Sequence, residues 1–230
     1  MKKSILLLYL TIVSFSIFAQ ELKEKKEDLD FMFRAEYHVL KSDKKVKQGM
    51  YTIFTKSKNK VAVRGNYDHN YLSGTWMFFD YQGNLEQRFD FDNQKLLFNQ
   101  PKLNDNSVSY QFPVKLSPED TVKAPIKIGG TFYGYSFVIK PNYDISSYLH
   151  NSGITKTEIV HYLNIDESGK IISWKSIVKA TNKEFENNIE KLSDFFKAFI
   201  PAELNGKNIQ STIIFTTTTR IITSNSVSIH

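Results

Sequence analysis

The sequence predicts an α+β protein: an N-terminal antiparallel β-meander followed by a β-hairpin–helix–strand module. Three observations lead to this prediction. Short aromatic strands alternate with polar turns in residues 31–99, prolines gather in residues 100–128, and a stripe of apolar residues at helical spacing follows Thr181. The 230 residues are 41% hydrophobic, which is sufficient for a packed core.

The first nineteen residues have the layout of a signal peptide. Lys2 and Lys3 precede an apolar run over residues 5–18, and the small residue Ala19 ends it. A spanning helix needs about 20 apolar residues, so an uncleaved anchor is the less favoured alternative. We expect a periplasmic or secreted protein with no membrane span after cleavage. The chain has no cysteine, which excludes disulfides and a lipid-modified N-terminal cysteine.

The charge pattern does not indicate a nucleic-acid partner. The formal net charge is +6, and removing residues 1–19 takes away two lysines and no acid, which leaves +4. Acidic and basic residues are closely mixed in residues 21–28, which is typical of a solvated polar leader. Nucleic-acid binding requires Lys and Arg clustered on one face, and no such cluster is evident in the sequence.

Residues 31–99 are predicted to form a series of hairpins. Apolar residues alternate with polar ones from Phe31 to Val39, which is the two-residue period of a half-buried strand. Over residues 49–98 the chain resembles the MORN-like repeats of bacterial envelope proteins. The residues that carry this resemblance are Gly65, Tyr67, Gly74, Trp76, Phe78, Phe79, Asp80, Gly83 and Leu85. An ordinary aromatic meander is the alternative, and in either case these are expected to be core and turn positions.

Residues 100–128 are predicted to connect the meander to the C-terminal part. Four of the six prolines lie here, namely Pro101, Pro113, Pro118 and Pro125. Proline cannot donate to a sheet ladder and restricts the residue before it, so regular structure is not favoured. Beyond this connection, two strands are predicted over residues 156–165 and 171–178, with Gly169 in the hairpin loop between them.

One amphipathic helix is predicted after that hairpin. Thr181 and Glu184 form a capping box, and apolar residues follow at spacings of four, three, four and three. This stripe consists of Phe185, Ile189, Leu192, Phe196 and Phe199. Pro201 is expected to end the helix, and a closing strand is predicted over residues 209–222.

The order of these elements resembles the C-terminal domain of the TonB family, in the form common in Bacteroidota, over residues 129–222. The matching positions are Gly129-Gly130, Ile165-Asp166, Gly169, Pro201-Ala202, Asn205-Gly206-Lys207 and Ile213-Ile214-Phe215. The resemblance implies a domain that binds an extended partner segment by strand addition at a sheet edge. Energy transduction is not expected. That activity needs an uncleaved membrane anchor and a long Pro-rich spacer, and neither is predicted from this sequence.

The closing strand is the predicted binding edge. The residues assigned to it are Ile209, Ser211, Ile213, Phe215 and Thr217. The expected partner is an envelope protein bound by strand addition, or peptidoglycan. Pairing of this edge within the chain or in a homodimer is the alternative.

No catalytic, cofactor-binding or metal-ligating residue is predicted. The five histidines lack the spacing of a metalloprotease motif, and His161 is expected to be a hydrogen-bonded core residue. The two Ser-x-x-Lys sequences lie in predicted turns. We therefore expect a non-catalytic envelope binding or scaffold protein. The alternative is a periplasmic enzyme acting on cell wall, which would need a cleft with a perturbed carboxylate or histidine.

Overall fold

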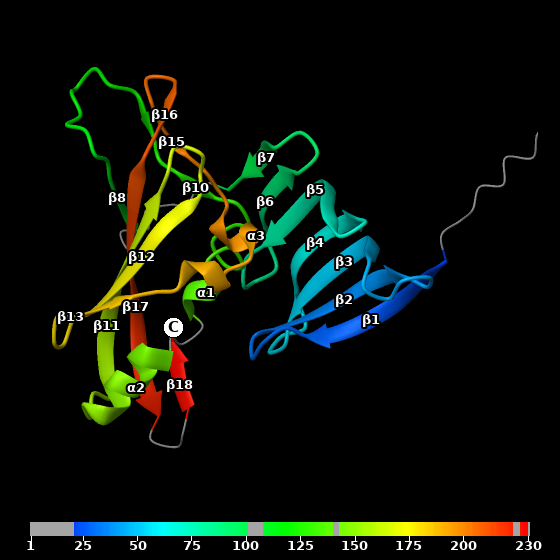
Figure 1. Ribbon diagram of the computed structural model, residues 1–230, viewed down its shortest axis with the longest axis horizontal. Helices are drawn as coiled ribbons and strands as arrows, with labels where there is room; N and C mark the ends of the chain where they lie inside the picture. Colours follow the sequence, from blue (N-terminus) through cyan, green and yellow to red (C-terminus); the bar gives the residue numbers. More distant parts are fainter. Residues whose placement is uncertain (1–20, 101–107, 140–142, 223–225, 230) are drawn as a thin grey trace, which may run out of the picture.

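The computed structural model describes residues 21–100, 108–139, 143–222 and 226–229. The predicted signal peptide lies outside these residues. Most of the described chain belongs to antiparallel sheets, and the helices are few and short. Two large sheets lie side by side, with short helices between them (Figure 1).

The first sheet is a meander whose seven strands follow one another in sequence order, as predicted. The strands are β1 (Leu22–Asp28), β2 (Phe33–Leu40), β3 (Lys47–Thr55), β4 (Val61–Asp68), β5 (Tyr71–Phe79), β6 (Leu85–Asp90) and β7 (Lys95–Asn99). The residues predicted to form a polar leader are indeed exposed, but they form the regular strand β1. This strand carries six charges in seven residues, which the sheet edge tolerates because both faces of the strand reach water.

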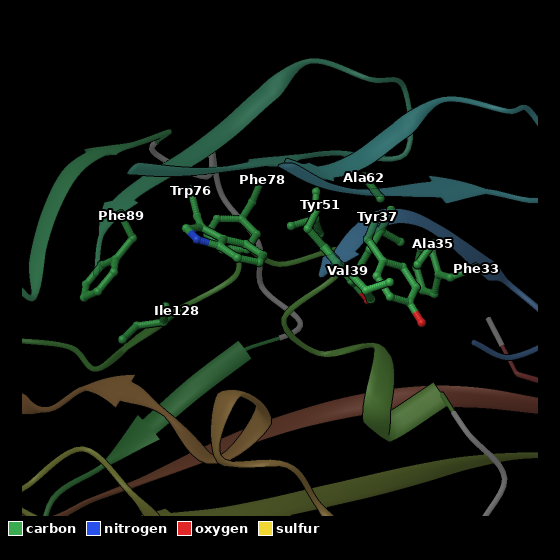
Figure 2. Close-up of a cluster of buried hydrophobic side chains, with 12 residues drawn as sticks. Phe33, Ala35, Tyr37, Val39, Tyr51, Ala62, Trp76, Phe78, Phe89 and Ile128 are labelled. Atoms are coloured by element: carbon green, nitrogen blue, oxygen red, sulfur yellow. The ribbon is translucent and has the colours of Figure 1, made fainter. Parts of the chain in front are cut away.

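One face of the meander forms the first hydrophobic core. In β2, the side chains of Phe33, Ala35, Tyr37 and Val39 are buried, and the residues between them are only half-buried. Figure 2 shows the buried side chains lying on the side of the sheet that faces the chain around Ile128. Burying an aromatic or large aliphatic side chain stabilises a fold by about 1.5–3 kcal/mol, so this face holds the meander to the rest of the protein.

Gly65 leaves room for Trp76 inside this core. A Cβ atom on Gly65 would lie 2.1 Å from Cδ2 of Trp76. The indole Nε1 donates to the carbonyl oxygen of Asn66 at 3.1 Å, and the ring packs edge-on against Tyr67. The expectation that Gly65 and Trp76 are packing positions is therefore confirmed.

The second sheet has the order β13-β12-β11-β17-β18, with β8 also paired to β17. Its strands are β8 (Val108–Gln111), β11 (Lys156–Ile165), β12 (Ile171–Val178), β13 (Lys183–Glu186), β17 (Ser211–Ile222) and β18 (Ser226–Ile229). The predicted hairpin is confirmed with the same bounds, as β11 and β12. Gly169 has a φ of 82° in its loop, as expected of the residue that takes the left-handed conformation.

Helices cover the second sheet in two places. Buried residues of α1 (Ser136–Ile139) join Leu163, Trp174 and Ile213 in one cluster. Ile145 and Leu149 of α2 (Tyr143–Asn151) pack on Ile159 and Val178 in another. The second sheet is thus built on two clusters of its own, distinct from the core under the meander.

The predicted helix over residues 181–199 is wrong. The chain instead forms β13, a 3₁₀ turn at Ile189–Lys191, α3 (Asp194–Lys197) and β14 (Phe199–Ile200). Residues 183–186 pair with the open side of β12, which satisfies their backbone groups in a ladder rather than in a helix. The apolar stripe still packs inward. Phe185, half-buried, packs beside α2, and the other four stripe residues join the cluster around α1, where Phe199 is buried.

The connection over residues 100–128 is more than a spacer. Three short strands of this segment pair with C-terminal ones: β8 with β17, β9 (Val122–Lys123) with β15 (Ala202–Leu204), and β10 (Ile126–Lys127) with β14. β15 continues into β16 (Lys207–Ile209) through a turn at Asn205-Gly206. The segment is therefore part of the sheets of the C-terminal half.

A buried amide on β6 joins the two parts of the molecule. The side chain of Gln87 is inaccessible to solvent, and its Nε2 donates to the carbonyl oxygen of Lys127 at 3.0 Å and to Asn99 at 2.9 Å. Its Oε1 accepts from the backbone N–H groups of Gly129 and Gly130, at 2.7 and 3.2 Å. One side chain of the meander thus orders the turn that leads into the second part.

Two neighbours reinforce this junction. The carboxylate of Glu86 accepts from the backbone N–H groups of Thr131 and Phe132, at 2.7 and 3.3 Å. The Lys127 ammonium donates to the carbonyl oxygens of Phe195 and Ala198, at 3.1 and 2.8 Å. Burial lowers the pKa of Lys127 well below its ordinary value, and the two carbonyl acceptors favour the charged form against that effect.

Replacing Gly65 by alanine tests the fit beneath Trp76. The added methyl group overlaps the indole ring, so we expect Gly65→Ala to lower the free energy of unfolding by about 1–3 kcal/mol. Chemical denaturation measures the loss. The exposed neighbour Asn66 gives a matched control, because Asn66→Ala keeps the backbone carbonyl that Trp76 uses and is expected to stay within about 0.5 kcal/mol. Equal stability of the two variants would contradict the packing described here.

Replacing Gln87 by leucine tests the junction. Leucine fills a similar volume but leaves the N–H groups of Gly129 and Gly130 without their acceptor. We expect Gln87→Leu to cost roughly 3 kcal/mol or more, since each unsatisfied buried polar group costs about 1–3 kcal/mol. Gln82→Leu, at an exposed turn position, is the control. A loss below about 1 kcal/mol for Gln87→Leu would show that the junction does not depend on this amide.

Candidate functional site

The residues predicted to bind a partner do not form a free sheet edge. β17 pairs with β11 along one side, while β8 covers Thr212–Phe215 and β18 covers Thr219–Ile222 on the other. Ser211 and Ile213 are buried, and Ile209 belongs to β16. The prediction of an open edge on the last strand was therefore wrong, because this twelve-residue strand is an interior strand of its sheet.

Phe215 and Thr217 serve the interior of the second sheet. The ring of Phe215 stacks on His161 with centroids 5.0 Å apart, and Oγ1 of Thr217 lies 2.9 Å from Nε2 of that histidine. Strand addition at Thr212–Phe215 would require β8 to leave. The structure thus places all five predicted binding residues in one region of the fold without exposing a row of unpaired backbone groups there.

His161 is a buried, neutral side chain, as expected. Trp174 donates from Nε1 to Nδ1 of His161 at 3.3 Å, so Nδ1 is an acceptor and Nε2 carries the proton that Thr217 accepts. Ser176 also bonds Nδ1, at 2.8 Å, and itself accepts from Asn187. Burial lowers the pKa of His161 to about 3. Its contacts are those of a structural hydrogen-bond network.

The described residues contain neither a metal-binding cluster nor a membrane-spanning helix. In residues 21–100, 108–139, 143–222 and 226–229, no group of three or more His, Asp or Glu side chains is placed to hold a metal ion. The helices in these same ranges are all too short or too polar to cross a membrane.

The open edge of the molecule that best fits a binding role is β7. Its five residues include one charge, and Leu97 and Phe98 are 43% and 37% exposed. Gln100 donates its backbone N–H to Glu86 of β6, so the N–H of Asn99 points to the opposite, outer side. Within the part of the chain that the structure describes, no strand pairs with that outer side. Apolar side chains and unpaired backbone groups therefore lie together.

The outer face of the meander, opposite the core, has a distinct chemistry. It carries three arginines on alternate strands, with apolar side chains between them. We call this surface the arginine face; it comprises Arg34, Phe54, Arg64, Met77, Phe79, Arg88 and Phe98. No prediction from the sequence identified it. The only signal was that each arginine sits next to a core residue in a strand with a two-residue period.

A pH series tests the neutral state of His161. Because the folded pKa of about 3 lies below the ordinary value, the unfolded chain binds more protons between these values. The stability from this site is therefore complete above about pH 6.5 and is lost as the pH falls, by up to about 1.4 kcal/mol per pH unit. Denaturation of the wild type and His161→Gln should give curves of stability against pH that converge in acid. The exposed His69→Gln is the control, and parallel curves for wild type and His161→Gln would refute a neutral His161.

No protein-family model, curated protein or solved structure matches this chain. Its function is therefore argued from the chemistry of its own surfaces. Two of these surfaces expose groups that the packing of the fold does not require, namely the open edge of β7 and the arginine face.

Proposed function

We propose that this protein is an exported, non-catalytic binding protein of the cell envelope, with a TonB-like second part. In this proposal, it engages a partner protein by adding an extended segment of that partner to the outer edge of β7. The observation that carries the proposal is the apolar, unpaired edge of that strand. The signal-peptide pattern of residues 1–19 supports export, and the order of elements over residues 129–222 supports a binding mode by strand addition.

Two other edge strands, β1 and β13, are protected in a way that β7 is not. β1 has charges at six of its seven positions, and β13 has them at three of four. Charged side chains on an edge oppose the approach of another strand, because adding that strand would desolvate them. β7 has only Lys95 at its start. An edge of this composition is either a binding surface or a site of self-association.

The composition of β7 favours a particular kind of partner segment. Main-chain hydrogen bonds to β7 would contribute most of the affinity, and alternate side chains would decide specificity. Leu97 and Phe98 offer apolar contacts, so a segment with β-branched or aromatic residues at alternate positions fits this edge. The second sheet would support the meander from its core side.

A charge placed on the edge tests this function. We expect Leu97→Lys to abolish capture of the protein partner from native envelope extracts, because the ammonium would be desolvated by an added strand. Leu22→Lys is the matched control, since Leu22 is an exposed leucine, 37% accessible, on the opposite edge strand β1. Hydrogen exchange of the purified complex should show new protection of the β7 amides.

Three outcomes would contradict the proposal. The same partner retained by Leu97→Lys would place the contact elsewhere. Retention of the wild type on peptidoglycan, with no protein partner, would replace strand addition by cell-wall binding. A concentration-dependent dimer in sedimentation that Leu97→Lys dissociates would show that a second copy of the chain occupies the edge.

A further inference from the structure

We propose that the arginine face is a second binding surface, and that its ligand is an acidic polysaccharide. This surface lies on the outer side of the meander, and it does not depend on strand addition at β7.

The choice of arginine is specific to this face. The chain contains 30 Lys and Arg residues, of which only four are arginines. Three of these, Arg34, Arg64 and Arg88, project from the same face of one sheet. The planar guanidinium differs from a lysine ammonium because it binds a carboxylate with two parallel hydrogen bonds. Such a distribution indicates recognition of an anionic group rather than solvation alone.

The strand register places two of the arginines in one row across the sheet. Arg64 lies opposite Met77, and Met77 lies opposite Arg88, so β5 separates the two arginines. Neighbouring strands are about 4.8 Å apart, which puts the two Cα positions about 10 Å apart across the sheet. Arg34, on β2, lies outside this row, because it pairs with Phe54, which pairs with Val61 and not with Arg64. A linear polymer with one carboxylate per disaccharide unit presents its charges at a similar interval.

Two of the three charges have no acidic partner among the described residues. Arg34 contacts Glu36 and Asn59. Arg64 and Arg88 are exposed, and the described residues provide neither of them with an ion-pair partner. Their charge is therefore available to a ligand, and this makes the Arg64–Met77–Arg88 row the centre of the proposed site.

The apolar side chains favour a sugar polymer over a chain of phosphates. Phe98 lies beneath the guanidinium of Arg88, with 5.9 Å from Cζ to the ring centroid, and Phe54 lies beneath Arg34 at 4.8 Å. Met77 and Phe79 fill the surface between the arginines. A sugar ring has an apolar face that packs on such side chains, whereas a phosphate chain would bring only charge to them.

A hollow beside this row has room for one sugar unit. Its volume is about 350 Å³, near the lower end for small-molecule sites. The lining residues are Lys60, Val61, Arg64, Phe79, Gln82 and Gly83. Phe79 and Val61 supply its apolar wall, while Arg64 and Lys60 supply positive charge. The Lys60 ammonium is positioned by the carbonyl oxygen of Gln82.

The test uses a hexasaccharide of alternating glucuronic acid and N-acetylglucosamine as the probe. Titration into the purified, isotope-labelled protein should shift NMR signals on the outer side of β4, β5 and β6, and raising the salt concentration should weaken binding. Arg64→Gln combined with Arg88→Gln is expected to weaken binding about tenfold or more, since charged hydrogen bonds are lost. Arg220→Gln, which changes the fourth arginine on β17, should leave the affinity unchanged.

The controls decide between acidic glycan and other ligands. Equal binding of a neutral N-acetylglucosamine hexamer would overturn the role of the carboxylates. Tighter binding of polyphosphate or single-stranded DNA would overturn the assignment to a polysaccharide. An equal loss in Arg220→Gln would show a non-specific charge effect. If the double variant is less stable than the wild type, the NMR titration of the wild type still tests the site. Signal shifts that lie outside the arginine face would refute it.

Discussion

The side-chain amide of Gln87 is the contact on which the arrangement of this molecule depends. It bonds at once to the edge strand β7, to β10 and to the Gly129–Gly130 turn. Because the amide is fully buried, it cannot form hydrogen bonds to water. Breaking any of its bonds within the protein therefore leaves a buried polar group without a partner. The turn it orders sends Phe132 and Tyr133 onto the meander and Phe137 into the core of the second sheet.

The same junction explains why α3 is only one turn long. Phe195 packs against the core under the meander, while its neighbour Phe196 packs into the cluster of the second sheet. Two successive residues of a helix point about 100° apart, so a segment that must reach both cores is held where they meet. Lys127 fixes this segment further by bonding the carbonyl oxygens of Phe195 and Ala198. A longer helix along one sheet would have lost one of the two contacts.

The surfaces left for function follow from how the sheets close. The second sheet uses both sides of β17 and covers one of its faces with helices, so its backbone groups are largely committed. The meander buries one face and leaves the other, together with the edge at β7, to solvent. A protein that binds through an open edge and an arginine-bearing face would therefore use its N-terminal part for contact and its C-terminal part for support.

The sequence by itself determined the local elements whose signal is periodic. The alternation in β2, the hairpin of β11 and β12 and the positive φ of Gly169 all follow from neighbouring residues, because burial of every second side chain and a tight turn are local requirements. The candidate sites were not predictable in this way. The arginine face depends on the register of Arg64 with Met77 and of Met77 with Arg88, and the status of β17 depends on a partner, β8, about a hundred residues earlier. The spacings of three and four in the apolar stripe after Thr181 are likewise compatible with a helix and with an irregular segment that packs between two cores. Only tertiary packing decided between them, since the backbone groups of residues 183–186 found their partners in β12.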